Sequence, residues 1–268
     1  MIATERPDKA TEFLSEGRVV VLVNGSPYCL VIPGTLNDFM FSPEDTNLKF
    51  QFSNLLKVIR LFAAFITLFL PGIYIAITNF HHELIPTELL FTIAASREFV
   101  PFPNIIEIFL MELSFEMIRE SGLRVPNPIG PTIGIVGALV LGEAAVTANL
   151  VSPFLIIVVA ITGICSFSIP DFSLNFAVRI SRFIYILLGY LAGFLGIALG
   201  IFIQLLTLCN LKSFGVDYLH PYKNANKESI STFFMHPIWK RAKNSSFLKP
   251  KKQYNQAEVG VAWRKKGD

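Results

Sequence analysis

Glu143 is a carboxylate within an apolar run, and its position suggests a chemical role. The run covers residues 129–148, and an acidic side chain at the centre of a membrane helix costs about 2.5–3.5 kcal/mol on insertion scales. We therefore expect Glu143 to face protein or water. Four residues fall within a helical sector of about 60°, and a fifth lies beside it. These candidate pore-lining residues are Thr132, Val136, Val140, Glu143 and Thr147.

A ring of several copies would turn this stripe into the lining of a pore. Its carboxylates would then attract cations, because acidic rings select charge in channels. Two other interpretations of Glu143 stay open: it reaches the headgroups or pairs with an arginine, or it relays protons. The other side of the helix carries small residues that allow close helix packing. The packing candidates are Gly130, Gly134, Ala138 and Gly142.

A second group of charged residues lies in residues 104–122. Glu112, Glu116 and Glu120 recur every four residues there, while apolar residues occupy another side of the helix. This amphipathic pattern predicts a helix at the membrane interface or against a watery vestibule. Arg119 follows Glu116 by three residues, so it can partly screen the acidic row.

Arg97 and Glu98 lie between Pro86 and Pro101. They form either a structural ion pair or a gating contact. No phosphate-binding GxxxxGK[ST], GxSxG or HExxH motif accompanies the charged residues. Residues 81–83 and the three cysteines lack the spacing of metal ligands. We therefore expect no enzymatic activity, no catalytic residues, no metal and no cofactor.

The elements that must position these residues are membrane helices. Of the 268 residues, 52% are hydrophobic and 16% are charged, whereas soluble domains carry about 25% charged residues. Four apolar runs are long enough to cross about 30 Å of hydrocarbon, namely residues 61–80, 129–148, 151–169 and 183–209. The predicted fold class is an all-α integral membrane bundle of about four transmembrane helices plus broken or interfacial helices.

Residues 1–56 are predicted to be a soluble remnant that contains a small β-hairpin. Residues 18–23 and 28–32 have the composition of strands, and Asn24-Gly25 between them is a strong hairpin turn signal. We expect this hairpin to pack against polypeptide outside the chain or against a neighbouring subunit. The polar first residues predict no signal peptide, so the first span would direct insertion.

The remaining chain divides into a transmembrane domain at residues 57–211 and a basic cytoplasmic tail at residues 212–268. An even number of spans with basic flanks predicts a multi-pass protein with both termini in the cytoplasm. The basic tail suits anionic lipid headgroups. The net charge of +3 is too small and too dispersed for a nucleic-acid surface.

Several ordered segments of the chain resemble one known family. They read TERPDK at residues 4–9, HELIPT at 82–87, REFVPFP at 97–103, FEMIRE at 115–120, IVGALV at 135–140 and SFGV at 213–216. Together they resemble the A subunit of GerA-type spore germinant receptors over about residues 4–245. The family carries a long soluble domain before the TERPDK-like segment and often a Gln at the position of Glu143, so we expect a shortened copy.

The resemblance implies a receptor subunit in the inner membrane of a dormant bacterial spore. Such subunits look like ring-forming channels that release cations when nutrients bind, and they act with a transporter-like B subunit and a lipoprotein C subunit. Two alternatives stay open. A secondary transporter subunit would also use broken helices and intramembrane carboxylates, and an inactive truncated membrane scaffold would insert without conducting.

Overall fold

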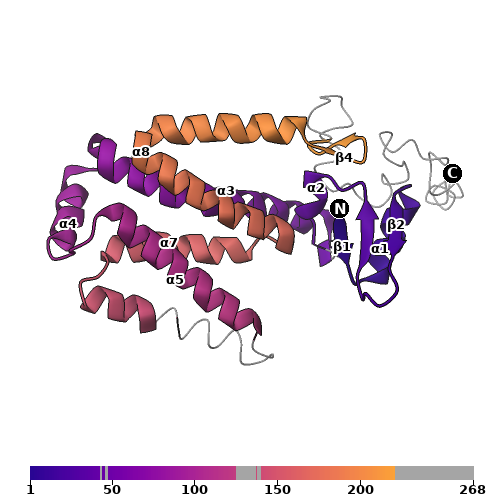
Figure 1. The fold of residues 1–268 in the computed structure, drawn as a ribbon, viewed down its shortest axis with the longest axis horizontal. Coiled ribbons are helices and arrows are strands. Elements are labelled where there is room, and N and C mark those ends of the chain that lie inside the picture. Colours follow the sequence, from indigo (N-terminus) through magenta and orange to yellow (C-terminus); the bar gives the residue numbers. More distant parts are fainter. Residues whose placement is uncertain (43, 46–47, 125–136, 138–139, 221–268) are drawn as a thin grey trace, which may run out of the picture. The chain divides into compact units, whose positions relative to one another are not determined.

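The computed structural model describes residues 1–42, 44–45, 48–124, 137 and 140–220 (Figure 1). The chain divides into two compact units. The first contains Met1–Val58 and the described residues from Gln204 on, and the second contains Ile59–Ile203. The helices at residues 50–80 and 172–210 therefore each have residues in both units.

The first unit contains a three-stranded antiparallel sheet of order β1-β3-β2, formed by β1 (Ile2–Thr4), β2 (Val19–Leu22) and β3 (Cys29–Ile32). Val19 pairs with Ile32 across the predicted hairpin, which confirms it. Strand β1 was not predicted, because three residues are too few to display an alternating pattern. Helix α1 (Pro7–Ser15) packs against the sheet.

Two short elements complete the described part of this unit. Helix α2 (Leu36–Phe39) begins with a capping box, in which Thr35 and Asp38 satisfy each other's backbone and side-chain groups. After the last helix, β4 (Lys212–Ser213) and β5 (Val216–Asp217) form a tight hairpin with Gly215 at φ 82°.

The second unit is helical. Its elements are α3 (Phe50–Phe80), the 3-10 turn η2 (His82–Leu84), α4 (Thr87–Arg97), α5 (Asn104–Arg124), a helical stretch at residues 140–147, α7 (Pro153–Phe167) and α8 (Phe172–Asn210). By length and composition, α3 and α8 are two candidate membrane spans, and α7 is a shorter apolar helix. The number of four spans stays a prediction, since much of residues 129–148 lies outside the described residues.

Helix α8 is not one straight rod but bends sharply at Gly193 (Figure 1). Gly193 has φ 57° and ψ −137°, a backbone conformation that residues with a Cβ rarely adopt. Beyond it the chain runs back along its own first half, because Gly196 abuts the Leu188 carbonyl and Gly200 abuts Tyr185. The single span predicted at residues 183–209 is therefore two antiparallel helical halves. Hydrophobic length alone carries no signal for such a turn.

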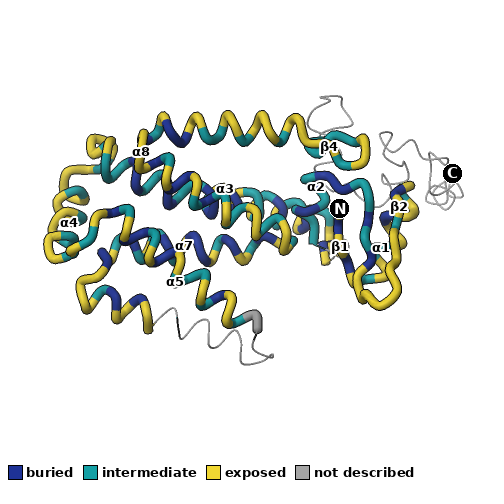
Figure 2. Tube along the Cα trace, viewed as in Figure 1, coloured by how far each residue is buried: buried dark blue, intermediate teal, exposed yellow. Residues whose placement is uncertain are grey.

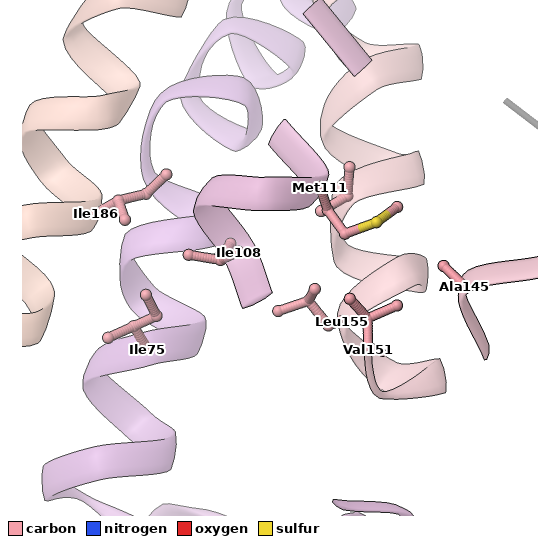
Figure 3. Close-up of a cluster of buried hydrophobic side chains, with 8 residues drawn as sticks. Ile75, Ile108, Met111, Ala145, Val151, Leu155 and Ile186 are labelled. Carbon is pink, nitrogen blue, oxygen red and sulfur yellow. The ribbon is translucent and has the colours of Figure 1, made fainter. Parts of the chain in front are cut away.

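The core of the second unit lies where α3, α5, α7 and α8 meet. Its buried apolar residues come from these helices, from the stretch 140–147 and from the turn before α7, and Figure 3 labels Ile75, Ile108, Met111, Ala145, Val151, Leu155 and Ile186. Exposed residues run along the helices in Figure 2, and many are large and apolar, for example Leu195 at 76% exposed. An apolar exterior of this extent is unusual for a soluble monomer and suits a lipid environment.

Close backbone contact joins α3 to the first half of α8. A Cβ added at Gly189 would lie 2.6 Å from the Gly72 carbonyl oxygen, and one added at Gly72 would lie 2.7 Å from the Tyr185 carbonyl oxygen. The Phe69 ring packs edge-on against Tyr185 beside this contact, at 4.8 Å between centroids. Glycine at these positions is what permits the two helices to approach this closely.

We expect Gly189→Ala to lower the free energy of unfolding by about 1–3 kcal/mol, because the added methyl group overpacks against backbone that cannot rotate away. Gly142→Ala is the matched control: among the described residues its Cβ would meet the Ile156 side chain alone, at an ordinary contact distance of 3.8 Å, and alanine favours a helix by up to about 1 kcal/mol over glycine. Thermal unfolding in one detergent measures both variants. Equal midpoints would contradict the close α3–α8 contact.

Candidate functional site

Helix α5 turns two of its glutamates into the protein, while Glu120 near its end is exposed. Glu107 and Glu112 are 1% and 0% exposed, while Leu113 and Met117 on the same helix are 58% and 67% exposed. The amphipathic pattern predicted that the acidic row faces an interface or a watery vestibule. Glu112 faces other helices instead, because in an apolar surrounding the charged side of a helix is the one that must be covered.

Arg182 of α8 lies at the centre of the covered charges. Its side chain is 0% exposed, and Nη2 lies 2.8 Å from Glu112 Oε2 and 3.1 Å from Glu116 Oε1. Arg179 Nη2 lies 3.4 Å from the second oxygen of Glu116. The attraction between such charges is strong in a low-dielectric interior, but it must offset the cost of removing them from water.

Arg119 closes the same network from α5. Its Nη1 lies 3.8 Å from Glu116 Oε1, so the predicted i, i+3 pair is present. Its Nη2 donates to Ser166 Oγ of α7, and the guanidinium lies over the Phe167 ring at 4.6 Å from the centroid. Three arginines thus surround two glutamates, and together these five residues link α5, α7 and α8.

The network is not fully hydrogen-bonded within the described residues. Glu112 Oε1, and Nε and Nη1 of Arg182, are buried without a hydrogen-bond partner there, and Glu112 Oε2 meets Arg182 Nη2 as an ion pair without hydrogen-bond geometry. Unsatisfied buried polar atoms are rare in native structures and usually indicate a missing partner, strain or a functional role. This polar cluster is therefore the strongest candidate for a functional site among the described residues.

A second ion pair fixes the start of α7. Arg97 Nη2 lies 2.8 Å from Glu107 Oε1, and Glu107 Oε2 accepts a hydrogen bond from the Ser152 backbone N–H at 3.1 Å. Ser152 caps α7 by accepting from the Leu155 N–H, so Glu107 lies where the helix dipole favours a negative charge. Arg97 does not bond to Glu98, which is exposed. No residue spacing predicts a pair across the loop from α4 to α5.

Part of the candidate pore stripe lies in the described residues. Val140, Glu143 and Thr147 are exposed, whereas Gly142 and Ala145 on the same stretch are buried. Thr147 Oγ1 donates to the Glu143 carbonyl oxygen at 2.9 Å, and no ion pair joins the Glu143 carboxylate to another residue of the described part. The other stripe and packing candidates lie outside the described residues, namely Thr132, Val136, Gly130, Gly134 and Ala138.

Glu112, Glu116 and Arg119 of this network were singled out from the sequence, but Arg179 and Arg182 were not. The last span was predicted to begin at residue 183, which leaves Arg179 and Arg182 outside it, whereas α8 begins at Phe172 and carries both inside it. Glu107 was not singled out, since it departs from the four-residue spacing of Glu112 and Glu116. The signal that was available is the pair of spacings: Glu112 and Glu116 are four residues apart on one helix, and Arg179 and Arg182 are three residues apart on another.

Comparison with known proteins identifies the family. The family model of the Bacillus/Clostridium GerA spore germination protein matches residues 1–247. Spore germination protein KA of Bacillus subtilis (strain 168) is 42% identical over 240 residues, which are 89% of this chain and 44% of that protein. Spore germination protein A1 of the same organism is 45% identical over 218 residues, 81% of this chain and 45% of that protein.

A third relative, the uncharacterized membrane protein YfkQ of Bacillus subtilis (strain 168), is 42% identical over 236 residues, which are 88% of this chain and 46% of that protein. The chain thus spans about half the length of these curated relatives. No solved structure matches it significantly. The match of the family model over residues 1–247 of the 268 shows that this protein belongs to the GerA family of Bacillus/Clostridium spore germination proteins.

Proposed function

We propose that the chain is a membrane subunit of a spore nutrient germinant receptor, and that copies of it form an oligomeric, nutrient-gated cation channel. The observation that carries the channel is the exposed stripe of Val140, Glu143 and Thr147 opposite the buried Gly142 and Ala145. A carboxylate exposed on an apolar bundle would face lipid unless water or another chain covers it, at a cost of about 2.5–3.5 kcal/mol. A ring of copies around a water-filled pore avoids that cost, because Glu143 then faces water.

The buried charges supply a way to couple this stripe to gating. Met111 of α5 and Ala145 of the stretch 140–147 belong to one packed cluster. A shift of α5 would therefore move the stretch that carries the stripe. The same shift must rearrange the pairs that Arg182 makes with Glu112 and Glu116. Packed interfaces of this kind tend to hold one of two discrete arrangements, which is what a gate requires. Arg97, Glu98, Glu112, Glu116 and Arg119 are thus our gating candidates.

Membership of the family supports a setting in the spore membrane for this receptor subunit. The receptor would lie in the inner membrane of the spore as a multi-pass protein with both termini in the cytoplasm and the basic tail against lipid headgroups. Its partners would be a transporter-like B subunit, which recognises the nutrient, and a lipoprotein C subunit. Binding at the B subunit would then open the channel by shifting a population between two states.

Reconstitution tests the proposal directly. Liposomes that contain this chain together with B and C subunits of one receptor are loaded with potassium, and efflux is recorded before and after nutrient is added. We expect nutrient-dependent efflux, absent from liposomes that lack this chain. Saturable, substrate-coupled uptake would instead identify a secondary transporter. Stable insertion without flux, together with no germination defect on deletion, would identify an inactive scaffold.

A further inference from the structure

Helix α2 binds three separate parts of the first unit through three consecutive residues. Leu36, Asn37 and Asp38 each form a hydrogen bond to a different segment. A helix of four residues is not stable by itself, because isolated helices shorter than about 12–15 residues are marginal in water. These three bonds, its capping box and the buried Phe39 therefore all help to hold it in place.

Asp38 ties α2 to the sheet and to α1. Its two oxygens accept from Arg18 Nη1 and Nη2 at 2.7 and 2.9 Å, and both side chains are nearly inaccessible to solvent. Arg18 Nη1 also donates to the Pro33 carbonyl oxygen at 3.1 Å, and its guanidinium covers the Phe13 ring of α1. Burial raises the pKa of Glu16, the other acidic neighbour of Arg18, to about 7. Bidentate bonds between charged groups are the strong ones.

Asn37 ties α2 to the start of α3. Its Oδ1 accepts from Lys57 Nζ at 2.6 Å, and Lys57 is only 1% exposed. The ammonium of Lys57 also lies 3.7 Å from the centre of the Phe41 ring. A buried ammonium needs such partners, since desolvation of an unpaired charge costs several kcal/mol. Lys57 lies in the part of α3 that belongs to the first unit, directly before the residues of the second unit.

Leu36 ties α2 to the chain that leaves α8. Its backbone N–H donates to the Tyr218 carbonyl oxygen at 3.0 Å, and the Tyr218 N–H donates to the Leu211 carbonyl oxygen at 2.9 Å. The rings of Phe39 and Tyr218 pack at 6.1 Å, and the Gly34 N–H donates to Ser213 Oγ at 3.3 Å. The segment after α8 is thereby held by the same four-residue helix.

We propose that α2 is a joint that transmits a rearrangement of the N-terminal sheet to the start of α3 and the end of α8 together. Its positioning residues are Asp38 on the side of the sheet, Asn37 with Lys57 on the side of α3, and Leu36 on the side of Tyr218. The mechanical connection stands on the contacts of the first unit alone. Its role in opening a channel rests on the proposed function.

Hydrogen exchange on the full chain in lipid nanodiscs tests the connection without any conductance measurement. Asp38→Asn removes the charge from the bidentate pair, which we expect to speed amide exchange about tenfold to a hundredfold. The increase should appear in α2, in residues 50–58 and in residues 211–218. The matched control is Asp8→Asn, since Asp8 forms an exposed pair with Arg6, and its effect should stay within α1. If exchange in Asp38→Asn became faster in β2 and α2 alone, with residues 50–58 and 211–218 unchanged, the proposal that α2 is a joint would be contradicted.

Lys57→Met tests the contact between α2 and α3, and it serves as the alternative if Asp38→Asn does not fold. Methionine keeps an apolar stem against Phe41 but cannot donate to Asn37. In the complete receptor we expect the nutrient concentration for half-maximal response to shift at least threefold, with single-channel conductance unchanged. A lower maximal response at an unchanged half-maximal concentration would show a purely structural role and contradict the joint. If the wild-type receptor conducts no ions at all, the proposed function is contradicted. The exchange experiment would still show whether α2 connects the sheet to α3 and to the end of α8.

Discussion

Replacing Arg182 with methionine is expected to destabilise the second unit by about 3–5 kcal/mol, because removing one partner of a buried ion pair leaves the other charge uncompensated. Glu112 would keep its place, 0% exposed, without the guanidinium that lies 2.8 Å away. Methionine is close to arginine in length, so the loss reports charge more than packing. The measurement is the midpoint of denaturant or thermal unfolding in a fixed detergent.

Two further variants separate charge from bulk. Arg182→Met combined with Glu112→Met removes both charges, and we expect it to recover most of the lost stability, since apolar replacement of a whole buried pair is often neutral or stabilising. Glu116 would retain Arg179 and Arg119. Arg6→Met removes an arginine from an exposed pair and should leave the midpoint unchanged. A double variant no more stable than Arg182→Met would refute the pairing.

The parts of the fold that the sequence predicted are those with a local signal. The β-hairpin of β2 and β3 was predictable because β-branched residues flank Asn24-Gly25, and the turn requires a residue that tolerates a positive φ, as Gly25 does at 86°. Strand β1 has no such signal, because its pairing with β3 depends on residues far along the chain. The bend of α8 at Gly193 is another case, since its sequence reads as one long apolar helix.

The candidate site likewise combines features that have a local sequence signal with features that depend on distant residues. The spacing of Glu112 and Glu116 places them on one side of a helix, but periodicity states only which residues share a side and not what that side meets. In water the charged side faces out, whereas in this unit it faces Arg182. Spacing marks Arg179 and Arg182 as neighbours on one helix but could not assign their partners, because Glu116 lies on another helix 66 residues before Arg182.

The charge of Glu143 should set the ion selectivity of the channel that we propose. At an effective dielectric constant of about 20, a unit charge roughly 8 Å from an ion changes its energy by about 2 kcal/mol, which is about a thirtyfold change in occupancy. Glu143→Lys reverses that charge in every copy, so we expect the preference for potassium over chloride to fall by at least this factor. Glu143→Gln, which only neutralises the charge, should give an intermediate preference.

Reversal potentials in potassium chloride gradients measure this preference in the reconstituted receptor. Glu88→Lys is the matched control, because Glu88 is also exposed but lies on α4, away from the stripe-bearing stretch in the sequence. It makes the same change in net charge and should leave the reversal potential unaltered. If Glu143→Lys and Glu88→Lys give the same reversal potential in a conducting receptor, Glu143 does not line the pore, and its exposed carboxylate must meet headgroups or an arginine of another chain instead.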